Sequence, residues 1–226
     1  MIANTIACAS PNFDVRALPV TMVVLHYTGM TDAAAALDRL TDPAAKVSAH
    51  YVVAEDGQVF ALVDEADRAW HAGRSWWRGV TDINSASVGI EIVNPGHEFG
   101  YRPFPVQQMD AVEALLAGIV QRHAVAPALV VGHSDIAPAR KDDPGELFDW
   151  PRLARAGLAL PIPAMGIDPK WTDAGFIMAL GRFGYDTTEA TPAVVAFQRR
   201  FRPRDWSGAI DAECRALLYG LLKPEG

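Results

Sequence analysis

The sequence has few cysteines and no excess of positive charge, and both shortages exclude classes of protein. Cys8 and Cys214 are the only cysteines among 226 residues and lie near opposite ends of the chain. They cannot form the closely spaced set of a disulfide-rich scaffold or of a thiolate zinc site, so we expect two free thiols. With 20 Lys and Arg against 27 Asp and Glu, the net charge is -7. This charge argues against a nucleic-acid partner, because such partners require a basic face.

Long hydrophobic runs are also missing. No stretch reaches the length that crosses a membrane, so we expect no membrane span. No Lys or Arg precedes Arg16, and no apolar core of a signal peptide is found. This predicts a cytoplasmic protein, with a periplasmic location as the alternative if a leader was removed. Half of the residues are hydrophobic, which is enough for a sizeable core without disulfides, and we expect a monomer.

Two short apolar runs each lead into a histidine. Residues 22–25 and 128–131 are typical of strands that are buried on both faces. The first run ends at His26, and the second ends at Gly132 with His133 directly after it. If the two strands lie side by side in one sheet, the two imidazoles converge.

The loop after His133 contains two neighbouring carboxylates and a lysine. Asp143 precedes Pro144-Gly145, a pair that forces a turn and restricts the direction of the carboxylate, although spacing alone leaves Asp142 open as an alternative. Two imidazoles and one carboxylate are the ligand set of a catalytic zinc that keeps its fourth position for water. Lys141 is placed to meet the oxyanion of a tetrahedral intermediate.

One acidic residue interrupts an apolar strand pattern. Within residues 87–94, Val88, Ile90 and Ile92 fall on one face and Glu91 falls on the other. A buried carboxylate is costly unless it is paired or lies near a cation. Glu91 is therefore our candidate for the general base that activates water and then protonates a leaving amine.

The other patterns predict helices and a hairpin. Helical spacing favours helices over residues 31–40, 105–123, 150–158, 174–183, 192–201 and 211–222. Strands over residues 49–54 and 58–63 are joined by Asp56-Gly57, a strong hairpin signal. Residues 1–19 and 66–82 show no periodicity, so we expect irregular segments there.

These elements predict an α/β fold with a mixed central sheet flanked by helices, followed by a small three-helix bundle. We expect a catalytic domain over residues 1–160, a linker over residues 161–170 and a helical domain over residues 171–226.

Five short motifs follow one another between about residues 10 and 158. They are Leu25-His26-Tyr27-Thr28, Ser48-Ala49-His50-Tyr51, Trp70-His71-Ala72-Gly73, Val88-Gly89-Ile90-Glu91, and Gly132-His133-Ser134-Asp135-Ile136-Ala137-Pro138 with Lys141 and Asp143-Pro144-Gly145. In this order they resemble the zinc N-acetylmuramoyl-L-alanine amidases, a family that includes phage lysozyme-type amidases, peptidoglycan recognition proteins and bacterial muropeptide-recycling amidases.

The resemblance implies roles for the residues already singled out. His26, His133 and Asp143, rather than Asp142, would bind Zn²⁺, Glu91 would be the catalytic acid and base, and Lys141 would stabilise the transition state. The reaction implied is cleavage of the amide between the lactyl group of N-acetylmuramic acid and L-alanine, in peptidoglycan or in (anhydro)muropeptides. A non-catalytic peptidoglycan-recognition module and a wall endopeptidase that uses the same zinc are the alternatives.

The resemblance also has weaker parts. The phage branch has Tyr where this chain has Ala49, so a Tyr role is in doubt. We expect Tyr27, His50, Trp70 and His71 to contact substrate; for the two histidines a structural role and metal binding are the alternatives, the second disfavoured because the set of three ligands is already complete. The C-terminal helices resemble a peptidoglycan-binding domain, and a helical cap packed on the catalytic domain is the alternative.

Overall fold

A mixed β-sheet forms the centre of the molecule in the computed structural model, which describes residues 5–164 and 166–223. Its six strands lie in the order β1-β5-β4-β7-β3-β8. The strands are β1 (Thr5–Ala7), β3 (Met22–Tyr27), β4 (Tyr51–Val53), β5 (Val59–Ala61), β7 (Ser87–Ile92) and β8 (Val130–Gly132). Neighbouring strands run parallel, apart from the expected antiparallel hairpin of β4 and β5. The expected mixed sheet is confirmed.

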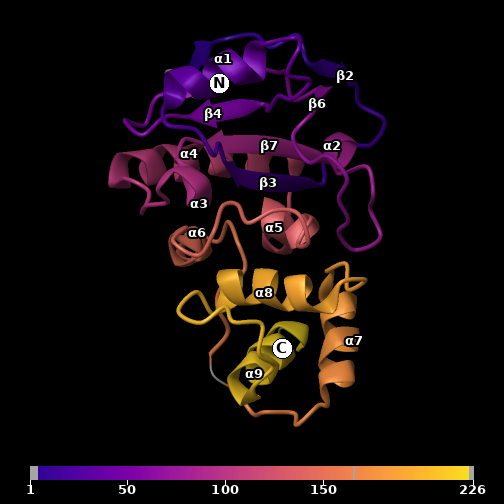
Figure 1. Cartoon of the computed structure of the whole chain (residues 1–226). Helices are drawn as coiled ribbons and strands as arrows, with labels where there is room; N and C mark the ends of the chain where they lie inside the picture. The colour runs from indigo at the N-terminus through magenta and orange to yellow at the C-terminus, as the bar shows by residue number, and fades with distance from the viewer. Residues whose placement is uncertain (1–4, 165, 224–226) are drawn as a thin grey trace.

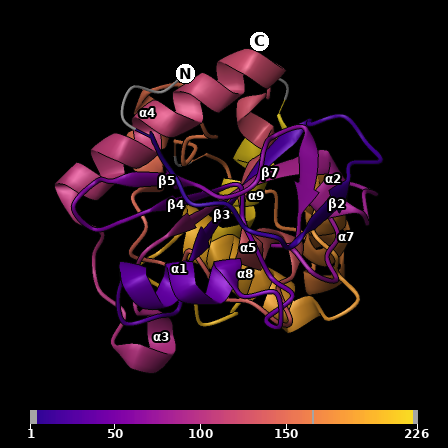
Figure 2. The ribbon, with the colours of Figure 1, turned by 90° about the horizontal axis from the view of Figure 1, so that it is seen from above.

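Helices cover both faces of this sheet (Figures 1 and 2). The helical elements of the described chain are α1 (Ala33–Thr41), α2 (Ile83–Ala86), α3 (Gly96–Phe99), α4 (Val106–His123), the 3-10 turn η1 (Pro127–Leu129), α5 (His133–Ile136), α6 (Trp150–Arg155), α7 (Asp173–Phe183), α8 (Ala190–Phe201) and α9 (Ala212–Leu222). None of the helices in the described part of the chain has the length and hydrophobicity of a membrane span.

The alternation of side chains along β3 divides the core into two sides. Val23 and Leu25 pack with the apolar stripe of α4, whereas Met22 and Val24 pack on the opposite side. Because successive side chains of a strand point to opposite faces, His26 lies on the side away from α4. The metal-binding candidates therefore face a part of the molecule that α4 does not cover.

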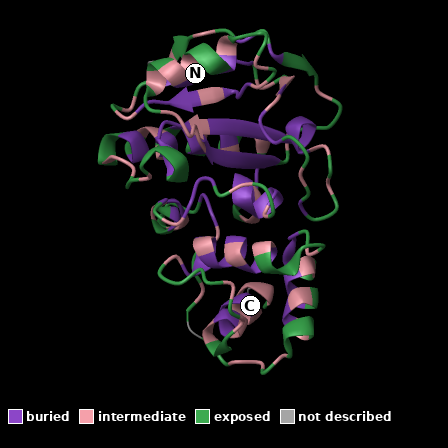
Figure 3. Cartoon of the chain, in the orientation of Figure 1, coloured by how far each residue is buried: buried purple, intermediate pink, exposed green. Residues whose placement is uncertain are grey.

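The three C-terminal helices share a hydrophobic core with the sheet. Phe176 of α7 and Phe197 of α8 are fully buried in the same cluster as Val24 of β3 and Val131 of β8. Figure 1 shows α8 lying between the rest of the molecule and the pair α7 and α9. In Figure 3 the sides of these helices that turn inward are the buried ones.

Two segments that were expected to be irregular contain short elements. Residues 1–19 hold β1 and β2 (Phe13–Val15), and residues 66–82 hold β6 (Asp67–Ala69). β2 and β6 pair with each other in a separate antiparallel sheet. These strands have three residues each and, unlike the equally short β4, β5 and β8, lie outside any longer apolar or alternating run, so the sequence carries no strand pattern there.

Candidate metal centre

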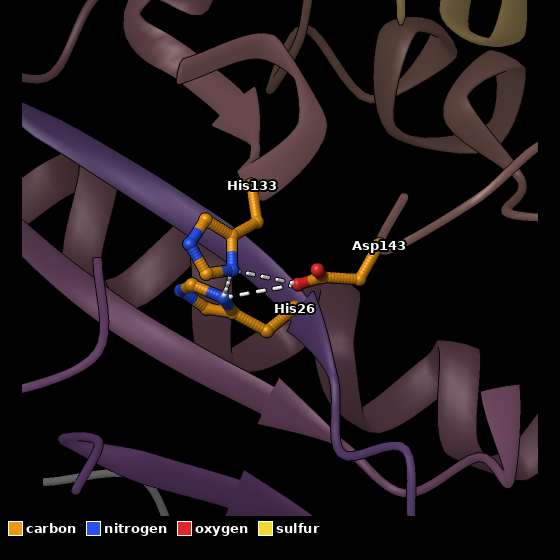
Figure 4. Close-up of side chains that lie close together, drawn as sticks. All are labelled: His26, His133 and Asp143. Carbon is orange, nitrogen blue, oxygen red and sulfur yellow. Dashed lines mark hydrogen bonds and ion pairs between the residues drawn. The ribbon is translucent and has the colours of Figure 1, made fainter. Parts of the chain in front are cut away.

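Three buried side chains bring one ligand atom each to a common point (Figure 4). The Nδ1 atoms of His26 and His133 are 2.9 Å apart, and each lies 3.1 Å from Oδ2 of Asp143. All three residues are at most 4% exposed. They form a group that can hold a metal ion.

The register of the sheet explains why the two histidines meet. β3 and β8 are neighbouring parallel strands in which Leu25 is paired with Gly132, so His26 and His133 follow at the same carboxyl edge. A Cβ at Gly132 would lie 2.7 Å from Cδ of Pro144, so only glycine lets the loop return this closely. The backbone N–H of Ser134 donates to the carbonyl of Asp143 at 2.8 Å and closes the loop.

Each of the two candidate ligand histidines has an outer partner in the segment that follows Trp70. His133 Nε2 donates to the carbonyl of Ala72 at 3.1 Å. His26 Nε2 lies 3.0 Å from Nδ1 of His71, whose Nε2 lies 3.2 Å from the Ser87 hydroxyl. That hydroxyl donates to a backbone carbonyl, so it accepts from His71, and His71 in turn accepts from His26.

This chain of hydrogen bonds fixes the protons of the site. Because both Nε2 atoms carry hydrogen, both Nδ1 atoms of His26 and His133 present lone pairs toward the Asp143 carboxylate. Burial, assisted by His133, lowers the pKa of His26 to about 4. Three lone-pair donors facing one another at hydrogen-bond distance suit a cation between them.

Glu91 lies beside this group. It is paired with His26 across the neighbouring strands β3 and β7, and both side chains fall on the side away from α4. Burial, with a smaller contribution from Asp143, raises its pKa well above the ordinary value, while Lys141 opposes this shift. Within residues 5–164 and 166–223, no hydrogen-bond partner reaches its buried Oε2 atom.

A hollow of about 370 Å³, here called the site hollow, opens over these residues. Its wall includes His133 and Asp143 together with the expected site residues Tyr27, Trp70, His71, Glu91 and Lys141. Three of the four expected substrate contacts are thus placed at the hollow. Of these, His71 is only 8% exposed, and its ring nitrogens are engaged by His26 and Ser87.

His50 is placed differently. It is fully buried, its Nδ1 accepts from the backbone N–H of Gly89 at 2.9 Å, and burial lowers its pKa to about 4. Among the residues that the structure describes, it is not part of the wall of the site hollow. This position favours the structural alternative, because the imidazole links β4 to β7 instead of facing the opening.

Comparison with known proteins identifies the family. The model of a family described as N-acetylmuramoyl-L-alanine amidase matches residues 16–146, a range that contains the three ligand candidates, Glu91 and Lys141. The chain belongs to this amidase family. The N-acetylmuramoyl-L-alanine amidase AmiD of Escherichia coli is 37% identical over 92% of this chain and 84% of its own length. The 1,6-anhydro-N-acetylmuramyl-L-alanine amidase AmpD of Haemophilus influenzae is 31% identical over 63% of this chain and 86% of its own length.

A solved structure supports the same assignment. The complex of AmiD from E. coli with anhydro-N-acetylmuramic acid-L-Ala-D-gamma-Glu-L-Lys superposes with a TM-score of 0.81 at 34% identity, covering 92% of this chain and 91% of that chain. The similarity thus extends through the C-terminal helices, beyond the residues that the family model matches.

Sequence reasoning missed two features of this amidase. It did not foresee that residues 71 and 72 supply the outer partners of both ligand histidines. It also did not foresee that Gly89 makes room for His71, since a Cβ there would lie 2.4 Å from its ring. The available signal was a pair of residues in two separate motifs, His71 in one and Gly89, directly before Ile90-Glu91, in the other.

Proposed function

We propose that this chain is a zinc-dependent amidase that cleaves the bond between the lactyl group of N-acetylmuramic acid and L-alanine. The observation that carries the proposal is the buried convergence of His26, His133 and Asp143 beside Glu91. Two imidazoles and a carboxylate are a common zinc ligand set, and tetrahedral ligands at about 2.0–2.2 Å from zinc would lie about 3.3–3.6 Å apart. The observed separations of 2.9 to 3.1 Å need only a small expansion.

Zinc at this position would polarise the scissile carbonyl and lower the pKa of water to about 7. Glu91 takes a proton from the attacking water and returns it to the nitrogen of the departing L-alanine. Its raised pKa suits both steps, because a carboxylate with an ordinary pKa holds the proton too weakly to deliver it to an amine. Lys141 binds the negative charge that develops on the carbonyl oxygen.

The wall of the site hollow offers cations to the acidic groups of a substrate. Arg39, Arg140 and Lys141 line it together with the carboxylates Glu91, Asp142 and Asp143. The stem peptide of a muropeptide carries carboxylates, which these cations can bind. Tyr27 and Trp70 offer aromatic surface for the sugar and peptide.

We also propose a substrate-binding role for the C-terminal helices. A second hollow of about 670 Å³ is lined by residues 74–76 and 136–140 together with Asp186, Thr188 and Glu189. Arg140 lines both hollows, so a longer wall fragment can extend from one to the other. In this proposal residues 1–160 are catalytic, residues 161–170 connect, residues 171–226 hold the wall, and the enzyme acts as a monomer.

Product masses test the proposed reaction. We expect a muropeptide incubated with the zinc-loaded protein to yield the free stem peptide beginning with L-alanine, and expect o-phenanthroline to stop the reaction. Cleavage within the stem peptide would instead identify an endopeptidase. Retention of the uncleaved muropeptide under every condition would identify a recognition module.

The form of the substrate needs a separate comparison. Release of stem peptides is measured from intact sacculi and from soluble 1,6-anhydromuropeptides at equal concentrations of stem peptide. Faster release from the soluble form supports recycling in the cytoplasm, and faster release from sacculi supports wall turnover in the periplasm.

A further inference from the structure

Helix α8 contacts the beginning of the loop that carries two metal ligands. Arg200 is 5% exposed, its Nη1 donates to Oδ2 of Asp135 at 2.5 Å, and its Nη2 donates to the carbonyl of Val130 at 2.8 Å. Asp135 stands two residues after His133 in α5, and its Oδ1 accepts from the Tyr185 hydroxyl at 2.5 Å. One guanidinium therefore joins the strand before His133 to the helical turn after it.

The preceding residue of α8 contacts the end of the same loop. Arg199 forms an ion pair with Asp142, and its Nε lies 3.5 Å from Oε2 of Glu146. Asp142 stands between Lys141 and Asp143 in the chain. Consecutive arginines of one helix thus hold the two segments that supply His133 and Asp143.

The loop depends on such contacts for its path. Residues 137–149 contain neither helix nor strand, so no regular backbone ladder fixes them. The carboxylate of Asp135, which is 1% exposed, also accepts from the backbone N–H of Gly132 at 2.7 Å. If its cation is removed, a buried carboxylate is left without a counter-charge and is drawn toward water. Such a movement carries α5 and His133 with it.

We infer that α8 positions the metal centre, with Arg200 acting through Asp135 on His133 and Arg199 acting through Asp142 on Asp143. The inference deepens the proposed function. It rests on one part of that proposal, namely that the site binds a metal ion. Both arginines are positioning residues, since neither reaches a ligand atom. Metal ligands tolerate errors of only about 0.2 Å, and outer partners that orient them are worth about 10–100-fold in affinity.

The test compares Arg200→Met with Arg202→Met in the full-length chain. Arg202 is a matched control because it is 2% exposed and pairs with Asp211 at 2.6 Å and Asp205 at 3.5 Å, both C-terminal to α8. We expect both variants to melt at a lower temperature. Only Arg200→Met should weaken Co²⁺ binding, by about 10–100-fold, and alter the visible absorption spectrum of the Co²⁺-loaded protein.

Two further variants keep the test decisive. Arg199→Met removes a pair whose carboxylate is exposed, so we expect it to fold and to lose about 10-fold in Co²⁺ affinity. Asp135→Asn combined with Arg200→Met should recover part of the affinity, because the neutral amide needs no counter-charge. Equal Co²⁺ affinities for Arg200→Met and Arg202→Met would overturn the inference. If Arg200→Met does not fold, wild-type affinity in Arg199→Met overturns it.

Metal affinity is measured without substrate, which separates the two proposals. A wild-type chain that binds Co²⁺ but releases no stem peptide refutes the proposed reaction and leaves the role of α8 standing. A chain that cleaves muropeptides while all arginine variants bind Co²⁺ equally refutes only the role of α8.

Discussion

Polar groups are buried in one way at the sheet edge that carries the site and in another way in the C-terminal helices. At the sheet edge, three lone pairs face one another and Oε2 of Glu91 has no hydrogen-bond partner in the described parts of the chain. In the helices, the buried cations Arg200 and Arg202 each meet a carboxylate of the chain. Nε of Arg200 and Nη2 of Arg202 also lack a hydrogen-bond partner in the described parts of the chain, but the charge of each guanidinium is balanced by a carboxylate, whereas the three lone pairs at the sheet edge point at one another. The sheet edge is therefore suited to binding and catalysis, whereas the buried charges of the C-terminal helices stabilise the fold.

The strongest challenge to this comparison is the loss of a ligand. Asp143→Asn should reduce zinc affinity by more than about 100-fold, beyond the effect of an outer partner, because a charged ligand becomes a neutral amide. Competition with a chelating dye measures the affinity. Asp142→Asn is the neighbouring control, for which we expect at most about a 10-fold loss. Similar losses in both variants would mean that the ligand has been assigned to the wrong carboxylate.

The next effect concerns the unpaired acid. Glu91→Gln should lower kcat about 10²–10⁴-fold, because the amide cannot accept or return a proton. Zinc affinity should stay within about 10-fold of the wild type, since Glu91 is not a ligand. Single-turnover release of stem peptide measures the effect. Wild-type turnover in a zinc-loaded Glu91→Gln protein would remove Glu91 from the mechanism.

A core substitution in the helices should have the opposite profile. Phe176 is fully buried in the cluster shared by α7 and the sheet, so Phe176→Ala should lower the free energy of unfolding by about 3–5 kcal/mol. Urea denaturation measures this loss. At temperatures where the variant stays folded, zinc affinity should be unchanged. A large drop in zinc affinity of the folded variant would show that the packing of the C-terminal helices and zinc binding are not independent.

The smallest expected effect concerns Gly89, which makes room for His71, the outer partner of His26. Gly89→Ala places a Cβ 2.4 Å from Cγ of His71, so this ring must move and its contact with Nε2 of His26 is disturbed. We expect zinc affinity to fall about 10–100-fold, as measured by the same dye competition. Gly166→Ala is the control, because among the residues that the structure describes its Cβ would meet only the carbonyl oxygen of Ala164, at 4.0 Å. Unchanged affinity in Gly89→Ala would show that His71 does not orient its neighbour.

Much of the site follows from local patterns. The apolar runs before His26 and His133 indicate buried strands, and the alternation around Glu91 places it on the side of β7 opposite Ile90. These inferences hold because a strand has a period of two, which reads directly from the sequence. The strand order that brings β3 beside β8 has no such local pattern, so the convergence of the two histidines follows only from the tertiary structure.

The features that escaped prediction all join distant segments. His71 and Ala72 serve ligands 45 and 61 residues away, and Arg200 contacts Asp135 across 65 residues. Arg16 likewise donates to the carbonyls of Glu65, Ser87 and Asp67, and so fastens the segment before β3. No periodic pattern in the sequence indicates which residue a buried arginine or histidine will contact, so such pairs are visible only in the tertiary structure.

The loop between His133 and Asp143 shows which features follow from the sequence and which follow only from the tertiary structure. The sequence by itself determined its chemistry, because a histidine at a strand end and an aspartate before Pro144-Gly145 are local features. Only the tertiary structure decided that His26 meets His133 and Asp143 from the adjacent strand and that α8 contacts both ends of the loop. The physical reason is that ligand geometry depends on contacts between segments far apart in the chain, whereas ligand identity depends on the residues themselves.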